Sequence, residues 1–160
     1  MAIFETKYFG EIIVDDEGFT NAKYNDQEIR IFFYEYNCYG DKIKTCLEII
    51  DKYIEVDEIA RNEIVKNYPK NEIIKNYFKD HFVDYGFEEE QIIEIFGVKD
   101  FKDFDIRSTV EKLEYPNLIF GIEDGKIKLS VDYMVYKESD QILCVKMDEK
   151  LNTIYFSHES

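Results

Sequence analysis

The spacing of hydrophobic residues changes twice along the chain and divides it into three parts. Between residues 10 and 36, the runs GEIIV, FTNAKY and EIRIFFYEY are rich in residues that favour strands. The turn-like segments 15–18 and 25–26 separate these runs. This first part is therefore predicted to be a three-stranded β meander.

From residue 40 to 115 the apolar residues recur at helical spacing. A stripe that follows the plausible N-cap Asp41 continues until Pro69 interrupts it, and another closes at Gly86. Two shorter helices are predicted next, one ending at Gly97 and one beginning with the capping-box pattern at 108–111. The middle of the chain is thus a helical segment.

After Pro116 the period returns to two, and the pair Asp124 and Gly125 suits a tight hairpin. Two more strands are expected near 141–147 and 153–157, so residues 117–158 form a second β meander. With few Pro and Gly residues and no linker, we expect one domain over residues 1–160. The predicted fold is α+β, an antiparallel sheet of about seven strands with the helical segment packed on one face.

The charge of the chain limits its partners. The sequence has 35 Asp and Glu against 20 Lys and Arg, a formal net charge of −15. Such a charge repels phosphate backbones and anionic membranes, so we expect no nucleic acid, no membrane and, if any charged partner, a basic protein. The alternative is that the acidity only keeps the protein soluble. The chain lacks the pattern of a signal peptide and any long apolar span, and we therefore expect a cytoplasmic protein.

The sequence has few residues suited to metals or cofactors. Cys38, Cys46 and Cys144 are odd in number and widely spaced, which is typical of reduced thiols packed as small hydrophobes. There is no glycine-rich phosphate loop, no G-x-S-x-G, no H-E-x-x-H and no C-x-x-C, and only two histidines. We expect no disulfide, no metal and no cofactor. Hydrolases built on paired carboxylates stay possible, because Asp and Glu are too numerous for any pair to stand out.

The polar residues near the C-terminal end are the candidate site or structural cluster: Asp132, Tyr133, Ser139, Asp140, Gln141, His158 and Glu159. His158 beside a carboxylate could act as a general acid and base or as half of a metal site; equally, it could anchor the last strand. Residues 139–141 could build a turn or face the same rim. His81 lies on an apolar stripe, which favours a packed core histidine over a catalytic one.

Three stretches, FGEIIVDDEG, EIRIFFYEY and the ending VDYMVYKESDQILCVKMDEKLNTIYFSHES, resemble a bacterial family catalogued as domain of unknown function two thousand and four. The sharpest likeness is in the tail, at Leu129, Val131, Asp132, Tyr133, Ser139, Asp140, Gln141, His158, Glu159 and Ser160. The resemblance implies a cytoplasmic bacterial protein of one domain and supplies no catalytic residue. A departure is Leu151, where relatives often have a glycine in the turn. Some relatives resemble immunity proteins of toxin systems.

Two hypotheses of different class follow. The leading one is a non-catalytic acidic protein-binding module. An immunity-type inhibitor of a basic toxin is one form that it could take. The alternative is an enzyme or small-ligand-binding protein with a site formed by the C-terminal strands. Edge strands at either end of the predicted sheet could pair between chains, so both a monomer and a homodimer are compatible with the sequence.

Overall fold

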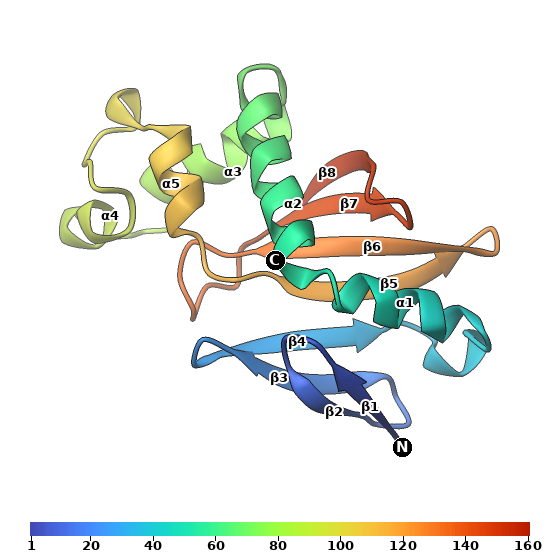
Figure 1. Cartoon of the computed structure of the whole chain (residues 1–160). Coiled ribbons are helices and arrows are strands. Elements are labelled where there is room, and N and C mark those ends of the chain that lie inside the picture. The colour runs from blue at the N-terminus through green and yellow to red at the C-terminus, as the bar shows by residue number, and fades with distance from the viewer.

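Six strands form one mixed sheet that crosses the molecule (Figure 1). The computed structural model describes residues 1–160. The order in the sheet is β3-β4-β5-β6-β7-β8. Its strands are β3 (Phe19–Tyr24), β4 (Gln27–Phe33), β5 (Asn117–Glu123), β6 (Lys126–Tyr133), β7 (Ile142–Asp148) and β8 (Thr153–Glu159). A separate two-stranded hairpin consists of β1 (Ala2–Thr6) and β2 (Gly10–Val14).

The α+β class is confirmed, but the predicted antiparallel sheet of about seven strands is wrong. The chain has eight strands in two sheets, and β2 pairs with β1 instead of joining β3 in a meander. In the larger sheet, β4 and β5 are parallel, with Ile31 opposite Leu118 and Phe33 opposite Phe120. The reason is the helical segment, which carries the chain from the end of β4 back to the start of β5, as parallel pairing requires.

The tight turns have the backbone geometry that their residues favour. Asp124 and Gly125 between β5 and β6 both have positive φ, 53° and 74°, which is the requirement of a type I′ turn. This confirms the predicted hairpin. Asn25 and Asp26 repeat the geometry between β3 and β4, with φ of 49° and 65°. Leu151 in the last turn also has a left-handed φ of 67°, the conformation that glycine adopts without strain.

Five helices lie between β4 and β5, with bounds α1 (Lys42–Ile50), α2 (Tyr53–Asn67), α3 (Glu72–Val83), α4 (Glu89–Phe96) and α5 (Ile106–Lys112). Their caps differ in part from the prediction. The capping box is at Glu88 and Gln91, at the start of α4, and Gly97 closes that helix with φ of 75°. The prediction of a capping box at 108–111 is wrong, because the N-cap of α5 is Asp105, whose side chain accepts a hydrogen bond from the Ser108 amide.

One face of the sheet is buried. Helices α1 and α2 cross it in Figure 1, and their buried side chains share one core with the inward side chains of the strands and of the β1–β2 hairpin. Cys46 belongs to this core, and Cys144 is buried on the other side of the sheet, whereas Cys38 is exposed. None of the helices combines the length and the apolar character needed to cross a bilayer.

The opposite face of the sheet is called the open face below. It consists of the side chains that alternate with the core residues along β3 to β8, together with Tyr34 just after β4. Three large aromatic side chains on it are exposed: Phe19 (42%), Tyr34 (60%) and Tyr155 (55%).

Candidate functional site

The seven candidate residues of the tail do not form one site. Side chains alternate across a strand, so the consecutive residues Asp132 and Tyr133 point to opposite faces of the sheet. His158 and Glu159 separate in the same way, with His158 opposite the core residue Leu143. Asp132 and Glu159 therefore lie on the open face, and Tyr133 and His158 lie on the helical face.

His158 and residues 139–141 do come together, at the edge of the sheet. The Nε2 atom of His158 lies 2.7 Å from Oε1 of Gln141 and 3.2 Å from the Tyr85 hydroxyl. Because the amide oxygen can only accept, Nε2 donates and is not free as a base. Gln141 donates to Asp140, and its backbone amide donates to Ser139 Oγ. These bonds tie β8 to the loop before β7, and His158 lines none of the four principal cavities.

Tyr133 belongs to a buried network that the sequence did not predict. Its hydroxyl donates to Asp57 Oδ1 at 2.6 Å, and Arg61 pairs with the same oxygen at 2.7 Å. Arg61 also donates to the backbone carbonyls of Val110, Leu113 and Glu114, so it ties α2 to the end of α5. Burial, followed by the nearby Asp57, raises the pKa of Tyr133 well above its usual value. The i,i+4 spacing of Asp57 and Arg61 was the signal available in the sequence.

On the open face, Asp132 and Glu159 flank Cys144. The Cys144 thiol donates to Glu159 at 2.9 Å, the Ser130 hydroxyl donates to Asp132, and Lys146 lies 3.3 Å from Glu159. Burial and the two carboxylates raise the pKa of Cys144, so it stays a neutral thiol and a poor nucleophile. The thiol bond and Lys146 lower the pKa of Glu159, whereas burial raises that of Asp132. We see a network that fixes three strands.

His81 is a packed histidine, as predicted. Only 1% of it is exposed, and Nδ1 lies 2.7 Å from the Tyr77 carbonyl, to which it donates. Nε2 is buried without a hydrogen-bond partner. Burial lowers the pKa of His81 to about 4, so the ring is neutral at pH 7.

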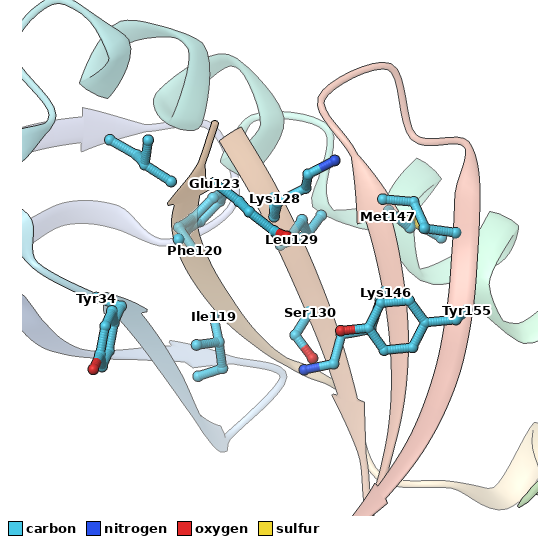
Figure 2. Close-up of a pocket in the computed structure, with 13 residues that line it drawn as sticks. Tyr34, Ile119, Phe120, Glu123, Lys128, Leu129, Ser130, Lys146, Met147 and Tyr155 are labelled. Carbon is cyan, nitrogen blue, oxygen red and sulfur yellow. The ribbon is translucent and has the colours of Figure 1, made fainter. Parts of the chain in front are cut away.

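A hollow of about 330 Å³ lies in the middle of the open face (Figure 2). Tyr34 stands on one side, Tyr155 and Lys146 stand on the other, and Ile119 and Ser130 lie between them. None of the seven candidate residues lines it. Gly121 contributes to the floor, and a Cβ atom added there would meet no atom within 4 Å. Sequence reasoning missed this hollow because its residues come together only through the order of the strands.

The second distinctive surface is called the acidic corner and comprises residues 80–98, from the end of α3 through α4. It has six carboxylates and no Lys or Arg: Asp80, Asp84, Glu88, Glu89, Glu90 and Glu94. All of these except Asp80 are exposed, and none takes part in a salt bridge. Burial and the nearby Asp84 raise the pKa of Asp80. Val83 and Ile93 are exposed among these charges, at 62% and 44%.

No protein-family model, curated protein or solved structure matches this chain. The resemblance to a bacterial family therefore stays a prediction.

Proposed function

We propose that the protein is a non-catalytic acidic binding module that docks a basic protein at the acidic corner. One observation carries the proposal: none of the six carboxylates of residues 80–98 forms a salt bridge within the chain. Holding like charges together costs free energy, which an incoming cationic surface would recover.

The apolar side chains of the acidic corner add to this argument. Val83 and Ile93 are exposed in the same segment as the carboxylates and add apolar surface to it. Protein interfaces commonly combine apolar area that loses water with polar and charged residues. The net charge of −15 would steer a basic partner from a distance. The family resemblance suggests a finer form of the proposal, an immunity-type inhibitor of a basic toxin.

The alternative, an enzyme or small-ligand-binding protein with a site on the C-terminal strands, has less support. It required the polar residues of the tail to converge around a cavity. Asp132 and Glu159 instead lie on the face opposite His158, and the hollow on the open face is lined by other residues.

Affinity capture tests the proposal with three baits. The wild-type protein is compared with a corner variant, Glu89→Gln/Glu90→Gln/Glu94→Gln, and with a hairpin variant, Glu5→Gln/Glu11→Gln/Glu17→Gln. Each variant removes three negative charges, so the two have the same net charge and differ only in where the charges were removed. All six positions are exposed. Bound proteins from a lysate of the source cells are identified at low and at high salt.

We expect a basic protein that the wild type and the hairpin variant retain, that the corner variant loses, and that high salt releases. Equal capture by the corner and hairpin variants would contradict the proposed surface. A partner that is acidic, or that binds equally well in high salt, would contradict the electrostatic basis of the proposal.

A further inference from the structure

The charges on the open face differ from those of the chain as a whole. Five basic side chains belong to this face: Lys23, Arg30, Lys126, Lys128 and Lys146. Five carboxylates belong to it as well: Glu28, Glu123, Asp132, Asp148 and Glu159. The formal charge of the open face is therefore zero, and the net charge of −15 lies entirely on the rest of the molecule.

Most of these charges are matched with a neighbour on the next strand. The strand register places Lys23 opposite Glu28. It also places Glu123 opposite Lys126, and Lys128 opposite Asp148. Lys146 forms an ion pair with Glu159. Opposite charges at such positions attract each other across the sheet, so the open face presents no uniform field to an approaching surface.

A row of aligned side chains that is apolar at both ends crosses the same face. The register aligns Phe19, Phe32 and Ile119 across β3, β4 and β5, and the row continues through Ser130 and Lys146 to Tyr155. Phe19 and Phe32 stack with ring centroids 4.3 Å apart. Large aromatic side chains left in water on a flat sheet are typical of an interaction surface.

We propose that the open face is the contact surface between two copies of this chain. A second copy also carries a net charge of −15, so two copies repel each other unless their contact avoids the acidic parts of the surface. The open face meets this condition, because its own formal charge is zero and it offers apolar area. Two such faces would pack as a sandwich of sheets, about 10 Å apart.

The shape of the face also suits a two-fold contact, which requires one surface to complement itself. The face has prominent side chains, Tyr34 and Tyr155, and a hollow between them. Gly121 keeps the hollow open, although glycine within a strand weakens it and often marks a close approach by another group. Each copy can therefore offer both a projecting ring and a place for one.

The available area is sufficient for a specific dimer. Six strands at about 4.8 Å spacing, each about seven residues long at about 3.3 Å per residue, cover roughly 550 Å². Two copies would bury about 1,100 Å² on this basis, slightly more than the roughly 1,000 Å² that a biological interface needs. A reversible dimer is thus the expected assembly.

Sedimentation equilibrium of the full chain, across concentration and salt, tests the proposal. The open-face variant is Tyr34→Glu/Tyr155→Glu. The control is Ile13→Glu/Ile73→Glu, which adds the same charge at positions that are 49% and 43% exposed and lie on β2 and α3, outside both proposed surfaces. Circular dichroism verifies that each variant is folded, as expected for exposed positions.

We expect a wild-type dimer whose Kd falls as salt rises, because salt screens the repulsion between two acidic chains. The open-face variant should raise this Kd by at least about 100-fold, and the control by about twofold. Gly121→Val, which fills the hollow, should raise it by about tenfold. A dimer strengthened by salt differs in sign from a basic partner released by salt, so the two proposals are tested separately.

Three results would overturn the inference while leaving the proposed basic partner unaffected. The first is a wild-type chain that stays monomeric at roughly 1 mM in high salt, a concentration at which a dimer with a Kd of about 1 mM would hold half of the chains. The second is a dimer that the open-face variant does not weaken more than the control does. The third is a dimer that dissociates as salt rises.

Discussion

The open face and the acidic corner carry comparable numbers of carboxylates but treat them in opposite ways. On the open face, carboxylates and lysines face each other across neighbouring strands, as Glu123 and Lys126 do. In the acidic corner, six carboxylates follow one another along α3 and α4 with no Lys or Arg between them. The comparison teaches that net charge alone does not describe this protein, because its distribution separates a neutral surface from an anionic one.

The largest expected effect is a loss of stability in acid that originates beneath the acidic corner. The pKa of His81 is about 4 in the folded protein, below the ordinary value of 6.5. The unfolded chain therefore takes up the proton first as pH falls, and stability decreases between pH 6.5 and 4, by up to about 3 kcal/mol from this group. Urea unfolding at a series of pH values measures this decrease.

Two variants assign the effect to its residue. His81→Phe should flatten the decrease, because no imidazole remains to be protonated in the unfolded chain. His158→Gln should leave most of it in place, because burial is the largest cause of the lowered pKa of His81 and the nearby His158 is a smaller one. An unchanged pH profile in His81→Phe would show that the acid sensitivity comes from another group.

An effect of about 1 kcal/mol is expected from substituting one glycine in each region. Gly121 on the open face has ordinary strand geometry and free space beside it, so Gly121→Val should stabilise the fold by about 0.5–1 kcal/mol. Gly97 at the end of α4 has φ of 75°, and Gly97→Val should destabilise by about 1–2 kcal/mol. Chemical denaturation measures the free energy of unfolding of both variants. A change in the same direction for both would contradict the described backbone geometry.

The smallest effect compares one charge reversal in each region. Glu94→Lys should stabilise by about 0.5 kcal/mol, because it relieves the acidic corner and places a cation at the C-terminal end of α4. Lys126→Glu should destabilise by a similar amount, about 0.5 kcal/mol, because it faces Glu123 with a like charge. Thermal unfolding at low salt measures both changes, and both should shrink at high salt. Shifts that persist at high salt would point to packing.

Local rules predicted the local parts of the fold. The hairpin at Asp124 and Gly125 and the C-cap at Gly97 follow from residues that adopt positive φ, and the structure has both. The pairing of β4 with β5 could not be read in this way, because alternation has the same period in parallel and antiparallel strands. Strand β1 was missed since its short run precedes any turn signal.

For the candidate site as well, the sequence pattern predicts the local arrangement but not contacts between distant strands. A period of two already separates Asp132 from Tyr133 and His158 from Glu159, so their division between two faces followed from the predicted strands. The hollow around Gly121 did not, because its residues come from four strands and from the end of β4. Its prediction needs the order of the strands, which the pattern of a single sequence leaves open.

The parallel pairing of β4 and β5 also sets an order of events for folding. Strands β5 to β8 are joined by short connections and can pair as neighbours, and so can β3 and β4. Joining these two units requires contact across the whole helical segment, between Ile31 and Leu118 for example. Closing such a long loop is entropically costly, so this seam should form late and open early. The open face, which spans the seam, would then become complete only in the last step of folding.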